Sequence, residues 1–253
     1  KMRRTRVIPV LLIHKEGVYK TKSFKDPRYI GDPINAIRLF NDLEADEIIV
    51  LDIDASKANK SANLEIIEDI VSEAFMPVAF GGGIDNTDLA RKILNLGVEK
   101  IIINKSAQKK DDLLMDCIKR FGSSSVIGCV DYKKDLYGEN RQFDHVNSSH
   151  IDNTLLEAVE RLQILGVGEI MINSVDRDGM MNGLDISTIK EITPTLDMPL
   201  IVCGGAESID DLKKASEAGA NAIAAGSMFV FLGKLKGVMI NYPSEQILNK
   251  YLK

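Results

Sequence analysis

Short apolar runs alternate with longer amphipathic stretches along the whole chain. Most of the apolar runs are continuous, which is the pattern of parallel strands buried on both faces. They predict strands at residues 6–13, 47–52, 77–80, 100–104, 125–131, 169–173, 199–203 and 222–225. The amphipathic stretches predict helices near residues 32–43, 62–74, 86–96, 109–121, 153–165, 185–193 and 209–218, and from Met228 onward.

Eight successive strand–helix units predict an α/β fold, a (β/α)8 TIM barrel, formed as one domain by residues 1–253. A doubly wound open sheet is the alternative. The two halves also echo each other, which indicates internal duplication of a half-barrel. Residues 80–84 follow the third strand as residues 203–206 follow the seventh, and residues 103–107 parallel residues 225–228.

Two neighbouring strand ends near the C-terminus carry small residues: Gly204 and Gly205 after the seventh strand, Gly226 and Ser227 after the eighth. Glycine lets a backbone approach a ligand closely, and N–H groups at the start of a following helix favour an anion. Phosphate sites of such barrels commonly lie after these two strands. We therefore predict a phosphate-binding site there; two ordinary strand-to-helix turns are the alternative.

The internal repeat predicts a second phosphate-binding site across the mouth of the barrel. Its residues are Gly82, Gly83 and Asn104, which follow the third and fourth strands. Two such sites on opposite sides of one mouth suit a small molecule that carries a phosphate at each end.

Composition narrows the class of protein. The formal net charge of -5 argues against a nucleic-acid partner. No apolar run approaches the length of a membrane span and no signal peptide is visible, so we expect no membrane contact and a cytoplasmic location. Cys117, Cys129 and Cys203 lack metal-ligand spacing and read as reduced buried thiols. We expect neither a metal nor a cofactor.

Residues 135–153, after the fifth strand, are polar, lack clear periodicity and contain two of the three histidines. They predict a long loop on the C-terminal face of the barrel, where loops often carry function. A solvated insertion without a role is the alternative.

Several short segments together carry a family resemblance: residues 8–9, 31–33, 51–53, 81–84, 103–104, 121–123, 168–170, 174–179 and 204–206. With them the chain resembles, over nearly its whole length, the cyclase subunit of imidazole glycerol phosphate synthase, a barrel of histidine biosynthesis. The resemblance implies a glutaminase partner that makes ammonia. It also implies that the ammonia passes through the barrel to a bisphosphorylated substrate at the C-terminal face.

The resemblance further implies two catalytic aspartates, a general acid and a general base, at the ends of the first and fifth strands. Asp131 takes one of these places, whereas Leu12 stands at the other. Leucine can neither donate nor accept a proton, so cyclisation is expected to be greatly slowed. His14 shares the face of Leu12 and is the obvious substitute, although it lies ~6–7 Å further along the strand.

Four other residues near the mouth are candidate site residues, two of them from the resemblance and two from their place at strand ends. Lys20, just beyond the first strand, matches a substrate-side lysine, and Gly179 matches a phosphate-binding position. Asp52 and Asp178 end the second and sixth strands. Either aspartate could orient a ligand hydroxyl or cap a loop.

Charged residues open four strands at the opposite end of the barrel: Arg6, Glu47, Lys100 and Glu169. Two cations and two anions in one ring could neutralise each other, although four separately solvated charges are the alternative. In the family that the chain resembles, the matching positions form a salt-bridged gate at the ammonia entrance.

A kept ammonia entrance with a broken catalytic pair resembles an offshoot of the family, encoded with surface-polysaccharide or flagellin-glycan pathways. This resemblance implies a barrel that accepts ammonia from a glutaminase and channels it to a sugar amidotransferase, which converts an acetamido sugar to an acetamidino sugar. Whether the barrel is itself an enzyme stays open. The alternatives are an active cyclase of histidine biosynthesis and a non-catalytic activator of the glutaminase.

Overall fold

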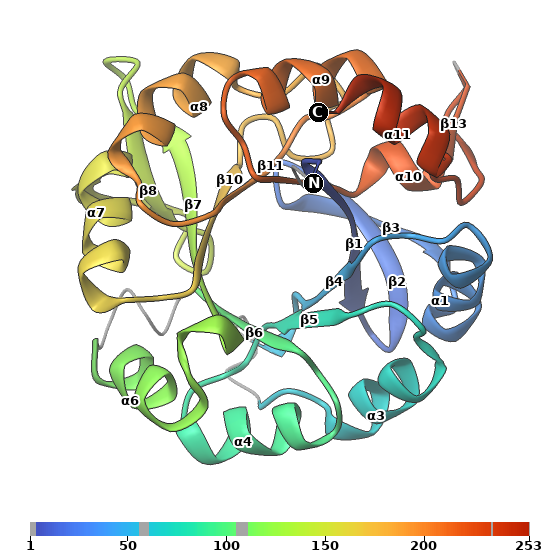
Figure 1. The fold of residues 1–253 in the computed structure, drawn as a ribbon, viewed down its shortest axis with the longest axis horizontal. Helices are drawn as coiled ribbons and strands as arrows, with labels where there is room; N and C mark the ends of the chain where they lie inside the picture. Colours follow the sequence, from blue (N-terminus) through green and yellow to red (C-terminus); the bar gives the residue numbers. More distant parts are fainter. Residues whose placement is uncertain (1–3, 56–60, 105–110, 234, 253) are drawn as a thin grey trace.

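The computed structural model describes residues 4–55, 61–104, 111–233 and 235–252. Eight parallel strands form a closed ring in the order β1, β4, β5, β6, β7, β10, β11, β12, and β12 pairs with β1 (Figure 1). The strands are β1 (Arg6–His14), β4 (Ile48–Asp52), β5 (Val78–Gly81), β6 (Lys100–Ile103), β7 (Val126–Lys134), β10 (Glu169–Ser174), β11 (Leu200–Cys203) and β12 (Ala222–Ala225). The predicted (β/α)8 TIM barrel is confirmed.

Helices between these strands cover the outside of the ring (Figure 1). They are α1 (Pro33–Asp42), α3 (Leu64–Glu73), α4 (Thr87–Asn95), α6 (Asp111–Phe121), α7 (Leu155–Leu165), α8 (Ile186–Ile192) and α9 (Ile209–Glu217), with the short 3-10 turns η1 (Ser123–Ser125) and η2 (Thr193–Thr195). Local sequence fixes several starts: the Thr154 and Ser208 side chains each accept a backbone N–H in a capping box. Among the described residues, no helix is both long and apolar enough to cross a membrane.

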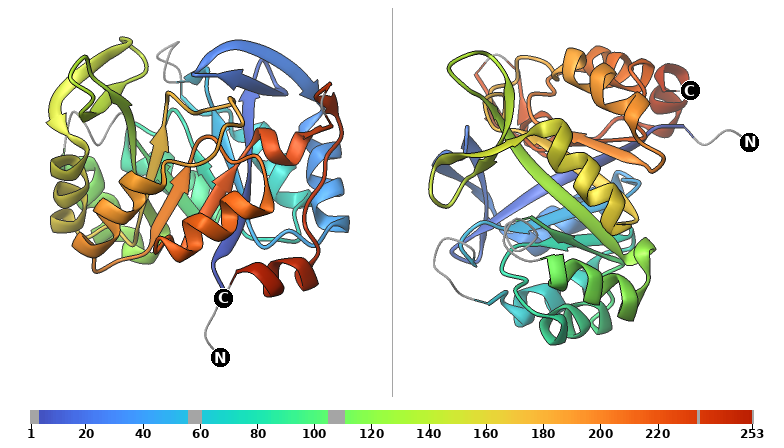
Figure 2. Two further views of the ribbon diagram at one scale, coloured as in Figure 1. Left: turned by 90° about the horizontal axis from the view of Figure 1, so that it is seen from above. Right: turned by 90° about the vertical axis from the view of Figure 1, so that its left-hand side faces the viewer.

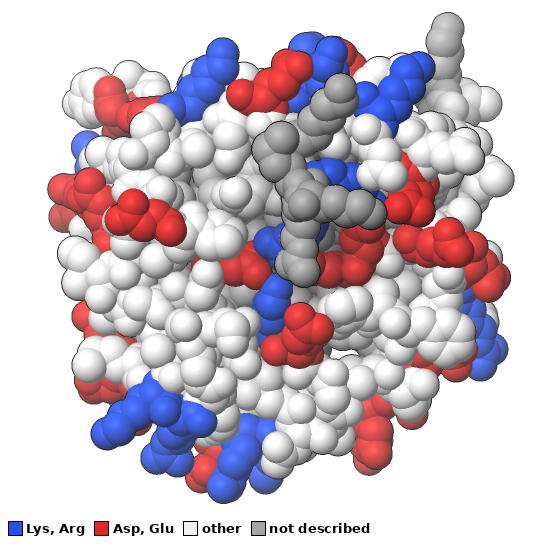
Figure 3. Space-filling view, in the orientation of Figure 1, with Lys and Arg blue, Asp and Glu red and all other residues white. Residues whose placement is uncertain are grey.

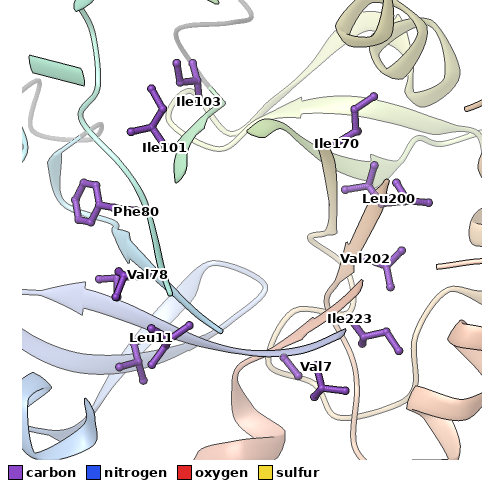
Figure 4. Packing of buried hydrophobic residues seen from close by; sticks show 14 of the residues in the cluster. Val7, Leu11, Val78, Phe80, Ile101, Ile103, Ile170, Leu200, Val202 and Ile223 are labelled. Atoms are coloured by element: carbon purple, nitrogen blue, oxygen red, sulfur yellow. The ribbon is translucent and has the colours of Figure 1, made fainter. Parts of the chain in front are cut away.

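Side chains of the strands alternate between two apolar layers. One set points outward and packs under the helices, as the labelled residues around the ring in Figure 4 illustrate. The other set fills the interior of the ring and includes Ile8, Ile49, Ile127, Met171 and Ile201. Because both faces of each strand are covered, the strands read as continuous apolar runs in the sequence.

The two ends of the barrel carry different structures. Seen from the side, both termini lie at one end, and the hairpins that extend the ring stand at the other (Figure 2). At the end with the termini, the Tyr242 hydroxyl donates to the backbone oxygen of Val7 at 2.9 Å, so the C-terminal segment is held against the start of β1. The final helix is α11 (Glu245–Tyr251).

Residues 135–153 do not form the long loop that was predicted. β7 runs on to Lys134, β8 (Asn140–Asp144) pairs with it, and β9 (Ser149–Thr154) pairs with β8, so the three strands form an antiparallel extension. Cross-strand contacts hold the extension together. The Lys133 ammonium nitrogen lies 5.5 Å from the centre of the Phe143 ring, and the centres of the Phe143 and His150 rings lie 5.6 Å apart.

One further prediction of local structure is wrong, and two hairpins were not predicted. The helix predicted from Met228 onward is only α10 (Ser227–Val230), because the backbone N–H groups of Met239 and Asn241 return to bond the carbonyls of its last turn. The chain then forms a small hairpin, β13 (Phe231–Leu232) and β14 (Gly237–Val238). A second unpredicted hairpin, β2 (Gly17–Lys22) and β3 (Lys25–Gly31), follows β1 and reaches over the mouth.

Candidate functional site

A cavity of about 310 Å³ opens at the carboxyl ends of the barrel strands. Its lining includes apolar side chains of the ring, namely Val10, Leu12, Leu51, Ile102 and Met171. The polar lining includes Asp52, Asn104, Asp131, His145, Asn173 and Asp178. We call this space the mouth cavity. Ligand sites of α/β barrels lie at this end, so the fold and the cavity indicate the same place.

Asp131 is the most heavily bonded carboxylate of the mouth cavity. It is 3% exposed and accepts from the Asn104 amide at 2.7 Å and from the Asn173 amide at 3.3 Å. Its Oδ2 also lies 2.8 Å from Nδ1 of His145. Asp131 and Asn104 both line the mouth cavity, and Asn104, which follows β6, bonds the Asp131 carboxylate.

His145 is a site residue for which no role was predicted from the sequence. It follows β8, and the carboxylate of Asp144 fixes the turn by accepting from the backbone N–H of Val146 at 2.9 Å and of Asn147 at 3.2 Å. The Phe24 ring and the His145 imidazole are perpendicular, and their centres lie 5.8 Å apart. The signal in the sequence was a histidine in a polar stretch after a strand that ends in aspartate.

A second, smaller cavity of about 30 Å³ adjoins the first, since both are lined by Val10, Leu12, Thr21, Asp178 and Cys203. Its other lining residues include Lys20, Gly179, Gly204, Gly205, Gly226 and Ser227. The structure therefore brings the predicted phosphate residues at the end of β11 and β12 together with the predicted lysine. We call this group the phosphate cup.

Lys20 is the cation of the phosphate cup. It is 5% exposed, its ammonium group donates to the backbone oxygen of Val10, and burial lowers its pKa to about 8. Asp178 lies beside it, accepts from the Thr21 hydroxyl at 3.0 Å, and has its pKa raised by burial to about 6. Two opposite charges are thus held in a place that disfavours both, which is typical of binding and catalytic sites.

Glycine is required in the phosphate cup for two different reasons. Gly205 has φ of +103°, and a Cβ there would collide with the backbone oxygen of Gly183. At Gly226 a Cβ would lie 2.5 Å from the Lys20 ammonium nitrogen. The first glycine is needed for the backbone turn, whereas the second leaves room for the cation.

The second predicted phosphate site is described only in part. Gly82 and Gly83 line the mouth cavity beside Asp52, but Lys105, Ser106 and Ala107 of the repeated segment lie outside the described residues. Asp52 caps its own loop, because one oxygen accepts from the backbone N–H of Asp54 at 2.9 Å and of Ala55 at 3.0 Å. Burial raises the pKa of Asp52.

The family resemblance implies a catalytic aspartate at position 12, where this chain has Leu12. Leu12 lines both cavities, so a carboxylate at this position would reach the mouth. His14 is turned to other partners: its Nδ1 lies 2.5 Å from Asp54, its ring meets Tyr19 edge-on at 4.7 Å, and it does not line the mouth cavity.

At the opposite end of the barrel the four predicted charges meet, and we call them the strand-start cluster. Arg6 bonds Glu47 at 2.7 Å and Glu169 at 2.5 Å, and Lys100 bonds Glu169 at 2.6 Å. Although burial opposes it, hydrogen bonds from Arg6 and Lys100 lower the pKa of Glu169. Figure 3 shows this end, with positive and negative side chains together in the middle of the face.

Between the two ends, the interior of the ring is apolar. From the strand-start cluster toward the mouth cavity it is lined by Ile8, Ile49, Ala79, Ile127, Ile201, Ala222 and Ala224. The alanines of β5 and β12 are small residues in this layer. Among the described residues, no group of three or more His, Cys, Asp or Glu side chains is placed to hold a metal ion.

Comparison with known proteins gives a consistent result. The sequence pattern of the family described as "Histidine biosynthesis protein" matches residues 6–236. A protein of Pseudomonas aeruginosa named "Putative imidazole glycerol phosphate synthase subunit hisF2" is 46% identical over 98% of this chain and 99% of its own length. The "Imidazole glycerol phosphate synthase subunit HisF" of Alkaliphilus metalliredigens is 37% identical over 88% of this chain and 89% of its own length.

Proposed function

The chain belongs to the histidine biosynthesis protein family, and from that premise we propose that it is the barrel subunit of a glutamine-dependent amidotransferase system. A glutaminase of the kind that pairs with HisF subunits docks at the end that carries the strand-start cluster. Ammonia enters between the four charges and leaves at the mouth cavity. A sugar amidotransferase then uses it to convert an acetamido sugar of a surface glycan to the acetamidino form.

One contrast carries this proposal: the ion pairs of the strand-start cluster are complete, whereas the mouth departs from the catalytic pair that the family resemblance implies. The strand-start cluster is complete, with each of its four charges in an ion pair. The mouth cavity is lined by Asp131 and by Leu12, and the family resemblance implies a second catalytic aspartate at position 12. Acid–base cyclisation needs both groups. A barrel that keeps its entrance and lacks half of its catalytic pair suits delivery of ammonia better than cyclisation.

The phosphate cup and its neighbours take a supporting role in this proposal. Lys20, Gly205 and Ser227 hold the phosphate of a small ligand, and Asp178 sets the charge of Lys20. Gly82, Gly83 and Asn104 hold a second phosphate across the mouth, and Asp52 shapes the loop beside them.

The test of the proposal is transfer of labelled nitrogen in the reconstituted system. The chain, its glutaminase and the sugar amidotransferase are supplied with amide-¹⁵N glutamine and excess unlabelled ammonium. Ammonia that passes through the barrel puts ¹⁵N into the amidino group. Product carrying only unlabelled nitrogen would show that ammonia reaches the sugar through the solution, and would contradict the proposal.

A blocked entrance separates conduction from activation. Lys100→Trp places a bulky side chain among the four charges, and Lys92→Trp, on an exposed position of α4, is the matched control. We expect Lys100→Trp to remove ¹⁵N transfer and leave glutamine hydrolysis intact. Unchanged ¹⁵N transfer with a demonstrably filled entrance would favour the alternative of a non-catalytic activator of the glutaminase.

A second candidate is an active cyclase of histidine biosynthesis. It is favoured by the name of the Alkaliphilus metalliredigens relative, a subunit of imidazole glycerol phosphate synthase. It requires a second acid or base at the mouth, and His14 is bonded to Asp54 instead. Turnover of the histidine-pathway bisphosphate with ammonium salt would decide for this candidate.

A further inference from the structure

The mouth cavity is lined by the imidazole of His145 as well as by acids and thiols. Among its titratable lining groups, Cys129 and Cys203 are held protonated, since burial raises the pKa of Cys203 to about 12 and that of Cys129 well above its ordinary value. Asp52 accepts two backbone N–H groups and Asp178 accepts the Thr21 hydroxyl. A neutral imidazole, by contrast, keeps one ring nitrogen as a hydrogen-bond acceptor.

His145 is held in one orientation. Oδ2 of Asp131 accepts a hydrogen bond from Nδ1 of His145. Because a carboxylate can only accept, the proton of a neutral His145 imidazole lies on Nδ1. Nε2 then carries the lone pair, and within the described part of the chain it has no hydrogen-bond partner. The Phe24 ring edge and the turn built on Asp144 restrict the ring from two further sides. His145 therefore brings a fixed acceptor nitrogen to the lining of the mouth cavity.

We propose that His145 is a ligand-contacting residue of the mouth, and that Asp131 is its positioning residue. The ligand is a small phosphorylated polyol or sugar. Its phosphate lies in the phosphate cup on Lys20, and one of its hydroxyl groups donates to Nε2 of His145. This inference rests on the phosphate site proposed above, but not on delivery of ammonia.

Two observations favour a ligand with both groups. The phosphate cup and the mouth cavity share five lining residues, so one molecule can occupy both. The phosphate cup supplies a cation and backbone turns. Asp178, which lines both cavities, and His145 supply acceptors, which suit hydroxyl groups. A sugar phosphate carries the matching anion and donors in one small molecule.

The chain contains only three histidines, so the imidazole nitrogens can be observed one by one. The experiment records long-range ¹H–¹⁵N spectra of histidine-labelled full-length protein with ribose 5-phosphate, with inorganic phosphate and with ribose. His145→Gln assigns the resonances of His145. His150→Gln is the matched control, because His150 lies in the same hairpin but is exposed and does not line the mouth cavity.

We expect His145 to carry its proton on Nδ1, and ribose 5-phosphate to shift its Nε2 resonance while inorganic phosphate and ribose leave it in place. Asp131→Asn should weaken the preference for the Nδ1 proton and reduce the shift. His145→Gln should weaken ribose 5-phosphate binding about tenfold, and His150→Gln should not change it.

Three results would overturn the inference. One is an unliganded His145 with its proton on Nε2. Another is binding of ribose 5-phosphate, seen on the backbone amides of Gly205 and Ser227, with the His145 resonance unmoved. The third is no binding of ribose 5-phosphate at millimolar concentration by a protein whose circular dichroism shows it folded. None of the three depends on the amidation assay, so a failure here is distinct from a failure of the proposed function.

Discussion

The two ends of the barrel handle buried charge in opposite ways. In the strand-start cluster, Arg6 and Lys100 face Glu47 and Glu169 in close pairs, and hydrogen bonds outweigh burial to lower the pKa of Glu169. At the mouth, burial dominates, because the pKa of Lys20 falls and that of Asp178 rises.

This difference separates a structural cluster from a binding site. A set of charges that satisfy one another needs no ligand. Charges that the fold holds at a cost are stabilised when a ligand of the right chemistry arrives. The comparison therefore supports the proposal that docking and passage take place at one end and ligand recognition at the other.

The largest expected effect is on the strand-start cluster. Glu169→Gln removes the acceptor that Arg6 and Lys100 share, and it should lower the free energy of unfolding by about 3 kcal/mol. Urea unfolding at neutral pH measures the loss. The control is Glu99→Gln, a neighbouring exposed acid, which should change stability by less than about 0.5 kcal/mol. Equal effects would show that the cluster is not a coupled unit.

At the mouth, Asp178 should make stability depend on pH with the sign opposite to that of Glu169 in the strand-start cluster. Because the pKa of Asp178 is raised in the folded state to about 6, the native protein binds more protons than the unfolded chain between about pH 4 and pH 6. Stability from this group therefore falls as pH rises through that window, by about 2–3 kcal/mol in all.

Asp178→Asn tests this sign directly. The variant should flatten the fall between about pH 4 and pH 6 in unfolding curves recorded across that range. Glu169→Gln should leave that fall in place and instead remove a rise at lower pH, since the folded-state pKa of Glu169 is lowered. An unchanged fall in Asp178→Asn would contradict the account of the mouth.

The phosphate cup should be sensitive to a single methyl group. Gly226→Ala puts a Cβ against the Lys20 ammonium group and should weaken phosphate binding about tenfold, as measured by calorimetry. Stability should change by less than about 1 kcal/mol, since the end of a lysine side chain can move. Gly31→Ala, which meets no atom within 4 Å, is the control. Equal phosphate affinity in both variants would exclude Lys20 from the site.

The pH dependence of phosphate binding is a change of condition that leaves the chain unaltered. With the pKa of Lys20 near 8, the ammonium charge is present below that pH and lost above it. Phosphate affinity should therefore be level up to about pH 8 and fall by up to about tenfold for each further pH unit. An affinity that stays level to pH 10 would show that another cation holds the anion.

The sequence predicted the ring well because its strands are buried on both faces. Continuous apolar runs mark all eight barrel strands, and the charges of the strand-start cluster stand directly before such runs, where the register of a barrel brings them together. The direction of the Leu12 side chain could also be predicted, because alternation along β1 places Leu12 with Val10 on the inner face of the ring.

The hairpin after β7 could not be predicted in the same way. Its pairing depends on contacts across strands, such as Lys133 with Phe143, and polar residues at such positions give no periodic signal. The place of His145 beside Asp131 follows from that pairing and was therefore missed. Likewise, nothing local to Lys20 shows that β2 folds back and buries it in the phosphate cup.

The most direct test of the central claim, a retained entrance with an altered mouth, is the cyclase reaction itself. The purified chain receives the histidine-pathway bisphosphate with a high concentration of ammonium salt, so that no glutaminase is needed. We predict no turnover, because Leu12 leaves Asp131 without the second acid or base. Recovery in Leu12→Asp would mean that one residue switched the site off, whereas no recovery would mean that the mouth is altered more widely. Turnover by the unaltered chain at the rate of an ordinary cyclase would contradict the account and make it an enzyme of histidine biosynthesis.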